Sequence, residues 1–307
     1  MLTGRDILTT RQFTREELSA ILGTAEGFES ALRERKALKN LENLVVASLF
    51  FEPSTRTRLS FETAALRLSG RVVSVSEAGG SSMAKGESLA DTIRTVDGYA
   101  DIIVVRHPQK GAAQAAADNA SHPVINAGDG TGQHPTQALL DLYTILKEKG
   151  RLSGLTLTLL GDLKNGRTVH SLSYLMALYG NRMILVSPPS LAMPPEIVAE
   201  ARAAGTEVVE IPDVEAAVAE SDIIYVTRVQ RERFADPAEY ESVKGSYVVD
   251  MRLIARAKPG VTVMHPLPRV DEIATEVDEY EGAAYFRQAH NGLPVRMALL
   301  ALVSGRI

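Results

Sequence analysis

Residues 50–62 read FFEPSTRTRLSFE, which crowds hydroxyl and guanidinium groups into a few neighbouring positions. Ser54, Thr55 and Thr57 supply hydroxyl donors, and Arg56 supplies a planar guanidinium whose fork matches a phosphate group. An apolar run precedes these residues and a helical pattern follows them, so we predict a loop between a strand and a helix. Backbone N–H groups and the positive end of the helix dipole favour an anion at such a loop. The alternative interpretation is a well-capped helix start with solvated arginines.

Two common nucleotide-binding motifs do not fit this chain. It contains no G-x-x-x-x-G-K-[ST] sequence, so the segment suggests phosphate without suggesting ATP. The glycines of GDLKNGR at 161–167 do not follow the G-x-G-x-x-G spacing, which leaves a dinucleotide site poorly supported.

Other basic and amide side chains also come directly after apolar, β-branched runs. Arg106 follows the run at 101–105, and Arg228 follows the run at 222–227. In parallel α/β sheets, ligands bind beyond the carboxyl ends of the strands, so these residues are predicted to share one edge. The set that we predict to gather around an anion is Arg56, Arg106, Arg167 and Arg228, with His134, Gln137 and His265 nearby.

Several members of this set also have a purely structural interpretation. His134 begins a helical pattern and could cap it, and His265 could be buried for packing without a catalytic role. Two prolines restrict the HPLP segment, so we expect it to shape a wall with its carbonyl groups. The Gly- and Ser-rich segment 77–88, which carries Lys85, has the composition of a solvated loop.

Composition excludes several classes of protein. The chain has 307 residues, a net charge of −5 and a pI near 5.8, which gives no basis for nucleic-acid binding. It contains no cysteine, so disulfides, thiolate metal sites and cysteine nucleophiles are excluded. We find no signal-peptide pattern at the N-terminus and no run of ~18 apolar residues. We therefore expect a soluble, cytoplasmic protein without a membrane partner.

The alternation of apolar runs with helical segments predicts an α/β fold with two lobes, each a mainly parallel sheet flanked by helices. The residues between the lobes, 134–150, are predicted to form a connecting helix that ends at Gly150. The first lobe is expected at 1–133 and the second at 151–290, with a helix at 291–307 packing back on the first. A cleft between two such lobes is the usual place for a ligand. The predicted strands are 44–51, 72–76, 101–106, 123–126, 155–162, 183–187, 207–211, 222–227, 247–250 and 261–265.

Taken together, the segments resemble the aspartate carbamoyltransferase catalytic-chain family, within the aspartate/ornithine carbamoyltransferases. The matching segments lie in order between about residues 44 and 273: FFEPSTRTRLSFE, MAKGESLADT, VVRHPQ, GDGTGQHPTQALLDLYTI, GDLKNGRTVHSL, TRVQRER and MHPLPRVDEI. Ornithine carbamoyltransferases share STRTR but carry an HCLP-type segment where this chain has HPLPR, which favours aspartate as the acceptor.

The resemblance implies a carbamoyl phosphate-binding first lobe. In this family's pattern, Ser54, Thr55, Arg56 and Thr57 would hold the phosphate. Arg106 would bridge the phosphate and the carbonyl oxygen, to which His134 would also donate. The carbamoyl amide would be held by Gln137 and by the carbonyl groups of Pro266 and Leu267.

The second lobe would bind aspartate. Arg167, with Thr168 beside it, would bind the α-carboxylate, and Arg228 and Gln230 would bind the side-chain carboxylate. Lys85 and a serine, Ser81 in preference to Ser82, would reach in from a neighbouring subunit of a homotrimer.

The implied reaction is carbamoyl transfer from carbamoyl phosphate to L-aspartate, an early step of de novo pyrimidine biosynthesis, without a metal or cofactor. Regulatory chains could join the trimer in a larger assembly. Two other functions remain open on the sequence: a carbamoyltransferase with another acceptor such as ornithine, and a two-lobed binding protein for small anions. An activity assay separates all three.

Overall fold

The structure, a computed structural model, describes residues 2–76, 85–234 and 236–307. The chain forms two compact units. Unit 1 comprises Met1–Leu140 and Asn291–Ile307, and unit 2 comprises Asp141–His290. The division expected near residues 133 and 150 stays a prediction.

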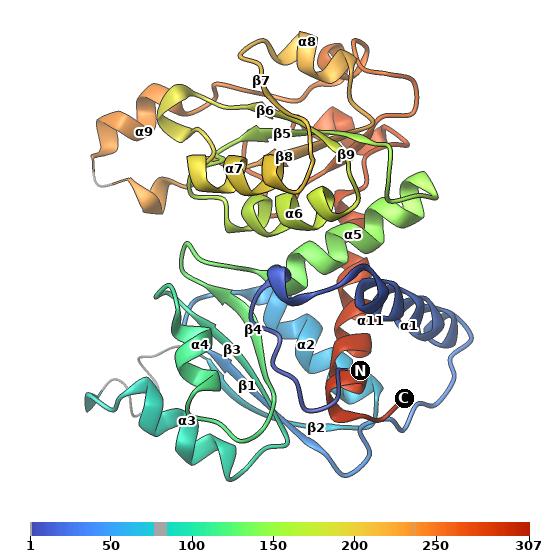
Figure 1. Ribbon diagram of the computed structural model, residues 1–307, viewed down its shortest axis with the longest axis vertical. Coiled ribbons are helices and arrows are strands. Elements are labelled where there is room, and N and C mark those ends of the chain that lie inside the picture. Colours follow the sequence, from blue (N-terminus) through green and yellow to red (C-terminus); the bar gives the residue numbers. More distant parts are fainter. Residues whose placement is uncertain (1, 77–84, 235) are drawn as a thin grey trace. The chain divides into compact units, whose positions relative to one another are not determined.

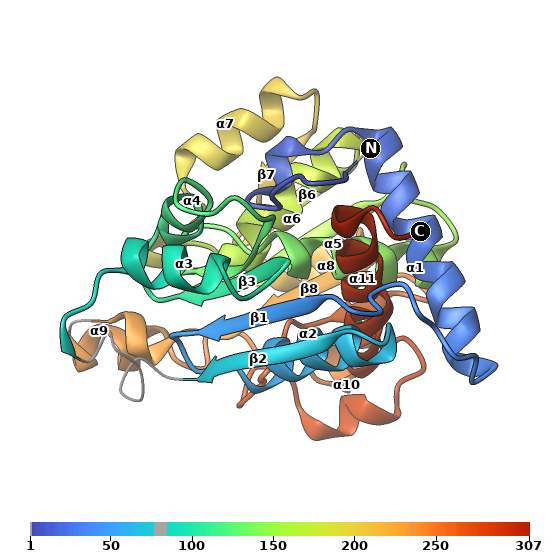
Figure 2. The ribbon, with the colours of Figure 1, turned by 90° about the horizontal axis from the view of Figure 1, so that it is seen from below.

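Unit 1 is built on a four-stranded parallel sheet with the order β2-β1-β3-β4. The arrowheads of β1 and β2 point the same way in Figure 2, as parallel pairing requires. The strands are β1 Val45–Phe50, β2 Arg71–Ser76, β3 Ile102–His107 and β4 Val124–Asp129. The helices that belong wholly or partly to this unit are α1 Arg15–Arg33, α2 Thr55–Arg67, α3 Leu89–Asp97, α4 Ala112–Ala117, α5 Pro135–Lys149 and α11 Tyr285–Ser304, with a 3-10 turn at Thr10–Gln12 (Figure 1).

The inner strands of unit 1 carry apolar side chains that are almost completely buried. Leu49, Ile103 and Val105 pack with Ile93 of α3 in one cluster. Burying each such side chain stabilises the fold by about 1.5–3 kcal/mol. A strand that is buried on both faces therefore needs a continuous run of apolar residues, and such runs predict these strands.

Polar contacts fix α2 on this sheet. The Glu62 carboxylate accepts hydrogen bonds from Ser48 of β1 at 3.0 Å and from Ser74 of β2 at 2.7 Å. Arg296 of α11 donates to the Ser60 hydroxyl at 2.8 Å from another side. Both contacts hold the helix in place along the strands, so the segment at its N-terminus has a defined position.

Unit 2 is built on a five-stranded parallel sheet with the order β7-β6-β5-β8-β9. The strands are β5 Thr156–Gly161, β6 Arg182–Val186, β7 Val208–Glu210, β8 Ile223–Thr227 and β9 Thr262–Met264. The helices beyond α5 are α6 Arg167–Leu178, α7 Pro195–Ala203, α8 Val214–Ala219, α9 Pro237–Val243 and α10 Met251–Ile254, with 3-10 turns at Pro189–Leu191, Arg231–Arg233 and Thr275–Glu279 (Figure 1).

The predicted α/β fold class is confirmed, with helices flanking two parallel sheets. The strand predicted at 247–250 is wrong, because Val249 forms an isolated bridge with Ile273 instead. The place beside β8 is taken by β9, with Ile223 opposite Thr262, so Val249 pairs with the 272–274 segment outside the sheet. The predicted tail helix is present but begins earlier, at Tyr285.

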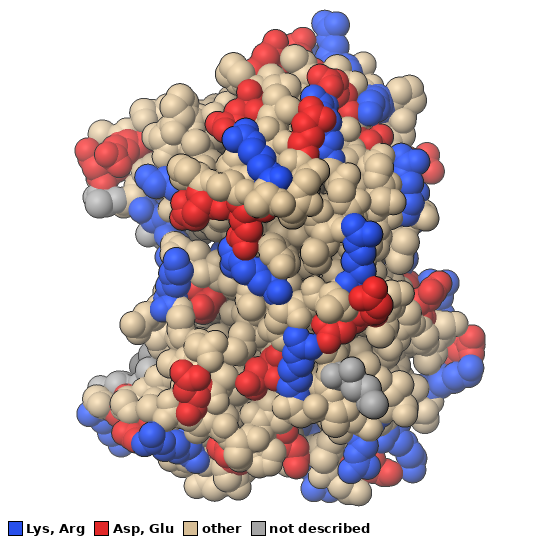
Figure 3. Space-filling model, viewed as in Figure 1, with Lys and Arg blue, Asp and Glu red and all other residues tan. Residues whose placement is uncertain are grey.

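Surface charge is mixed on the face shown in Figure 3, where basic and acidic side chains are interspersed. In the described ranges, which omit residues 1, 77–84 and 235, no helix is both long and apolar enough to cross a bilayer.

Candidate active site

The STRTR segment lies where β1 passes into α2, as predicted. Ser54 is the N-cap residue, and the first backbone bond of the helix runs from Arg58 N to Ser54 O at 3.2 Å. The N–H groups of Thr55, Arg56 and Thr57 therefore precede the first intrahelical bond. The Ser54 side chain makes no capping hydrogen bond to the helix within the part of the chain that the structure describes. This geometry disfavours the interpretation of STRTR as only a capped helix start.

The side chains of this segment differ in exposure. Thr55 and Arg56 are exposed, while Thr57 is buried. Partial desolvation lowers the pKa of the Arg56 guanidinium, which stays charged because a guanidinium is the weakest acid among the basic side chains. An exposed cation beside open N–H donors suits an anion from solution.

Arg106 stands at the end of the neighbouring strand β3, opposite Phe50 of β1. Its side chain is buried, and its Nη1 donates to the Ala127 carbonyl at 3.2 Å. The Glu52 carboxylate lies 3.5 Å from its Nε. These contacts fix the guanidinium at the same sheet edge as Arg56, as expected for neighbouring parallel strands.

His134 and Gln137 begin α5 after the loop that follows β4. Both are buried, and the His134 carbonyl accepts the N–H groups of Gln137 at 3.1 Å and Ala138 at 3.2 Å. The backbone of His134, rather than its ring, thus provides these two bonds at the helix start. The carbonyl group of an N-cap residue accepts such bonds whatever its side chain does, so the capping interpretation of the imidazole stays open.

The loop before His134 is held tightly. The Asp129 carboxylate accepts the N–H groups of Gln133 at 2.6 Å and Gly111 at 2.9 Å. Gly130 has a φ of +54°, and a Cβ there would lie 2.4 Å from the Pro108 carbonyl oxygen. The glycine is required by this close approach, and the contacts define the entry to α5.

In unit 2, two predicted aspartate-binding segments meet at the carboxyl ends of β5 and β8. Gly161 of β5 pairs with Thr227 of β8, and a Cβ on Gly161 would lie 2.3 Å from the Thr227 carbonyl oxygen. The Gln230 amide donates to the Asn165 carbonyl at 3.3 Å, which joins the two segments. Arg167 begins α6 two residues after Asn165.

Thr168 and Arg228 turn toward different neighbours. Thr168 is half-buried, and its side chain hydrogen-bonds to the buried Tyr225 hydroxyl. Arg228 is also half-buried, and its positive charge is one cause that lowers the pKa of His265, after burial and opposed by Glu272. Arg228 therefore lies near the HPLPR segment that follows β9.

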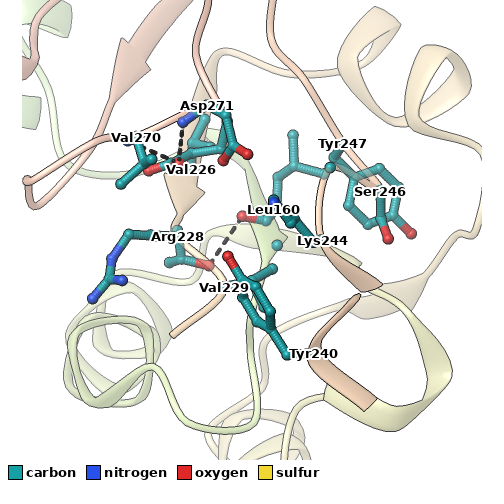
Figure 4. A pocket seen from close by; sticks show the side chains of 14 residues that line it. Leu160, Val226, Arg228, Val229, Tyr240, Lys244, Ser246, Tyr247, Val270 and Asp271 are labelled. Carbon is teal, nitrogen blue, oxygen red and sulfur yellow. Dashed lines mark hydrogen bonds between the residues drawn. The ribbon is translucent and has the colours of Figure 1, made fainter. Parts of the chain in front are cut away.

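A pocket of unit 2 lies beside Arg228 (Figure 4). The Arg228 side chain extends away from the ring of Tyr240 in that view. The pocket is lined by Leu160, Gly161, Val226–Val229, Tyr240, Lys244–Tyr247 and Val270–Glu272.

The HPLPR segment leaves β9 with an unusual backbone. His265 is 1% exposed, which agrees with the interpretation that it is buried for packing. Leu267 has a φ of +56°, and the bond from Leu267 to Pro268 is cis. Pro266 and Leu267 are only partly buried, so this turn is accessible to solvent.

The proposed neighbouring-subunit residues are only partly described. Lys85 is exposed, as a residue serving another subunit would be in a single chain. Ser81 and its alternative Ser82 lie outside the described residues.

Sequence reasoning missed the carboxylates that position these groups. Glu52 beside Arg106 could have been found from its place directly after an apolar run. Glu272, which contacts His265, could not, because its partner is known only from the folded chain.

Known proteins resemble the chain over almost its whole length. Residues 5–147 match the family described as aspartate/ornithine carbamoyltransferase, carbamoyl-P binding domain, and residues 153–303 match the corresponding Asp/Orn binding domain. An aspartate carbamoyltransferase catalytic subunit of Thermococcus gammatolerans is 56% identical over 98% of each chain. One from Methanothrix thermoacetophila is 54% identical over 99% of each chain.

Solved structures show the same similarity. Aspartate transcarbamoylase from Trypanosoma cruzi, in complex with carbamoyl phosphate and aspartate, superposes with a TM-score of 0.94 at 40% identity, covering 98% of this chain and 97% of that one. The catalytic subunit of M. Jannaschii aspartate transcarbamoylase gives a TM-score of 0.88 at 48% identity, over 96% of each chain.

Proposed function

The chain belongs to the aspartate/ornithine carbamoyltransferase family, and from this premise we propose how its residues divide the work of carbamoyl transfer. The chain is a carbamoyltransferase that transfers the carbamoyl group of carbamoyl phosphate to L-aspartate, giving N-carbamoyl-L-aspartate and phosphate. This reaction is an early step of de novo pyrimidine biosynthesis. We assign phosphate to unit 1 because of the start of α2 at STRTR. There the N-cap side chain makes no capping bond, and the backbone N–H groups of the first turn lie beside Arg56.

Unit 1 binds carbamoyl phosphate in this proposal. Ser54, Thr55, Arg56 and Thr57 hold the phosphate, since their hydroxyl, guanidinium and backbone donors surround one helix start. Arg106 bridges the phosphate and the carbonyl oxygen, with its guanidinium held in place by Glu52 and the Ala127 carbonyl.

The carbamoyl group is held by residues of three segments. His134 donates to the carbonyl oxygen, and Gln137 binds the amide together with the carbonyl groups of Pro266 and Leu267. The bond from the Leu267 N–H to His265 Nδ1 at 2.8 Å supports this role, because a carbonyl acceptor must be held in place to select an amide.

Aspartate binds to unit 2. Arg167, with Thr168, takes the α-carboxylate, and Arg228 with Gln230 takes the side-chain carboxylate. The Gln230 bond to the Asn165 carbonyl supports the pairing, because it holds the two segments together.

The mechanism follows from these placements. The neutral amine of aspartate attacks the carbonyl carbon, negative charge grows on the carbonyl oxygen, and phosphate leaves. Fixed donors at the oxygen and the leaving group stabilise that charge without rearranging. Two anionic substrates repel each other, so the arginines must offset the repulsion while aligning the attack. Such alignment can supply ~7–11 kcal/mol of the barrier reduction.

In this mechanism no side chain acts as a covalent nucleophile, and the family pattern calls for no metal or cofactor. The chain is proposed to form a homotrimer in which Lys85 and Ser81 complete the site of a neighbouring subunit. The relatives are named catalytic subunits, which supports an assembly with further, regulatory chains. A cytoplasmic location remains a prediction from the sequence.

Purified protein is expected to form N-carbamoyl-L-aspartate from carbamoyl phosphate and L-aspartate, with or without EDTA. Product formation and phosphate release are both measured, and L-ornithine replaces aspartate in a parallel reaction. Turnover of ornithine at an equal or higher rate would overturn the aspartate assignment. Absence of turnover with either amine would return the chain to a binding protein for small anions.

Arg228→Ala is expected to weaken the use of aspartate far more than the binding of carbamoyl phosphate. The reason is that Arg228 follows β8 in unit 2, whereas the phosphate residues lie in unit 1. The KM for aspartate and the Kd for carbamoyl phosphate are measured separately. Arg182→Ala is the matched control, because this arginine is the first residue of β6, at the amino end of a strand of the same sheet, whereas Arg228 follows the carboxyl end of β8. Equal losses of carbamoyl phosphate binding in Arg228→Ala and Arg56→Ala would contradict the division.

A further inference from the structure

A buried carboxylate in unit 2, that of Glu272, uses both of its oxygens on the turn that follows β9. Its Oε1 lies 2.6 Å from His265 Nε2. Its Oε2 accepts the N–H groups of Val270 and Asp271, each at 3.1 Å. Glu272 is 7% exposed and His265 is 1% exposed, so water does not compete for these bonds. Burial is the largest single influence and would raise the pKa of Glu272, but the hydrogen bond and charge of His265 and the backbone N–H donors together outweigh it and lower that pKa, so the group is an acceptor at neutral pH.

The carboxylate decides which nitrogen of His265 carries the proton. An ionised carboxylate only accepts, so Nε2 of the ring must donate to it. Burial, together with the charges of Arg228 and Arg269, lowers the pKa of His265 despite the opposing effect of Glu272, and the ring is neutral. Its Nδ1 is then left with a lone pair. The Leu267 N–H lies 2.8 Å from that nitrogen and donates to it.

The Leu267 backbone needs such an anchor. Its φ of +56° lies in the left-handed region, which a non-glycine residue adopts at a cost of about 1 kcal/mol or more. Strained residues persist where the surroundings over-determine them, and they cluster at ligand-binding positions. Here the anchor is the Nδ1 lone pair, which exists only in the tautomer that Glu272 selects.

A second buried network holds the backbone at the start of the turn. The Gln288 Oε1 accepts the His265 N–H at 2.8 Å, and the Gln288 Nε2 donates to Asp141 at 2.6 Å. The other oxygen of Asp141 accepts the Tyr225 hydroxyl at 2.8 Å. The Asp141 carboxylate thus sets the orientation of the Gln288 amide, just as Glu272 sets the tautomer of His265.

We propose that Glu272 is a positioning residue for the carbamoyl group: it holds His265 in the Nε2–H tautomer, and the freed Nδ1 fixes the Leu267 backbone so that the carbonyl groups of Pro266 and Leu267 face the carbamoyl amide. The proposal rests on the proposed function, which assigns those two carbonyl groups to the amide. It adds the residue that orients them, and it gives the buried histidine a role that is neither catalytic nor mere packing.

Two substitutions, Glu272→Gln and Asp141→Asn, each replace a buried carboxylate by an amide. Comparing them distinguishes the positioning role of Glu272 from a general contribution of buried carboxylates to stability. In Glu272→Gln, the new amide can turn its oxygen toward His265 Nε2, but its NH₂ group then faces the N–H donors of Val270 and Asp271. The opposite orientation places the NH₂ group against Nε2 and forces the proton to Nδ1, where it opposes the Leu267 N–H. Neither orientation preserves the turn. In Asp141→Asn, the Tyr225 hydroxyl can rotate and accept, so the Gln288 bond survives.

The measurement is the ratio of the Kd for carbamoyl phosphate to the Kd for inorganic phosphate, by calorimetry on the wild-type enzyme and the variants. Inorganic phosphate lacks the amide, so its affinity reports on the phosphate donors, which are STRTR and Arg106, without the contacts to the amide. We expect Glu272→Gln to raise the ratio by roughly tenfold, the scale of a lost hydrogen bond with its unpaired partner. Asp141→Asn and the surface control Glu148→Gln are expected to leave it within about twofold. Glu148 is a suitable control because it pairs with Arg287, beside Gln288 on the same helix.

An unchanged ratio in a folded Glu272→Gln enzyme would overturn the proposal, as would equal changes in Glu272→Gln and Asp141→Asn. If Glu272→Gln does not fold, ¹⁵N NMR of the wild-type histidine rings provides the test, and a proton on His265 Nδ1 would overturn it. Absence of carbamoyl transfer by the wild-type enzyme would contradict the proposed function while leaving the tautomer measurement intact. The two failures are therefore distinguishable.

Discussion

Arg56→Lys is expected to lose carbamoyl transfer almost completely, with kcat/KM for carbamoyl phosphate reduced on the order of 10²-fold or more. The positive charge is retained in this variant, so the loss would come from geometry. An ammonium is a point charge and cannot reproduce the two parallel bonds that a guanidinium makes to a phosphate. The position is exacting because Arg56 lies in the first turn of α2, where the backbone donors have fixed directions.

The control for this variant is Arg67→Lys. Arg67 is the last residue of the same helix and is exposed, so the change there has the same chemistry without contact with substrate. Binding of inorganic phosphate, steady-state kinetics and the melting temperature are measured for both. Near-normal phosphate affinity in Arg56→Lys would show that Arg56 is a solvated arginine at a helix start, the alternative that the sequence left open.

The fold could be predicted from the sequence because its signals are local. Buried parallel strands require runs of apolar, β-branched residues such as 101–105, and short loops with polar residues separate them from helices. The error at 247–250 has the same origin. YVVD has the composition of a strand, but its pairing depends on β9 occupying the place beside β8, which is a property of the whole sheet.

The candidate site could be predicted in its binding groups but not in the groups that position them. Arginines directly after strands share one sheet edge by geometry, so Arg56 and Arg106 could be placed together in advance. The Glu52 contact with Arg106 and the Glu272 contact with His265 depend on side-chain packing between segments. In the sequence, Glu52 and Glu272 are each a single acidic residue, and most acidic residues are exposed to solvent, so neither indicates a contact.

Mixing two inactive enzymes is expected to restore activity if Lys85 serves a neighbouring subunit. His134→Ala should lose mainly turnover, on the order of 10²-fold, because it removes one donor to the carbonyl oxygen. Lys85→Ala should also be almost inactive by itself. The two proteins are dissociated, mixed in equal amounts and reassembled. In a cyclic trimer, a site is intact when its own chain carries His134 and the next chain carries Lys85, which holds for roughly a quarter of sites.

The control mixture is His134→Ala with Arg56→Ala. Both residues belong to unit 1 and are proposed to serve the site of their own subunit, so every site in that mixture keeps one lesion and no recovery is expected. Recovery in the first mixture alone would therefore demonstrate a site shared between chains. If mixed trimers form, as shown by mass, and the first mixture stays inactive, Lys85 serves its own subunit or only the structure of its loop. Recovery in both mixtures would instead mean that one site takes His134 and Arg56 from different chains. The fold argues against this, because both residues follow strands of one parallel sheet, β4 and β1, whose carboxyl ends lie along the same edge.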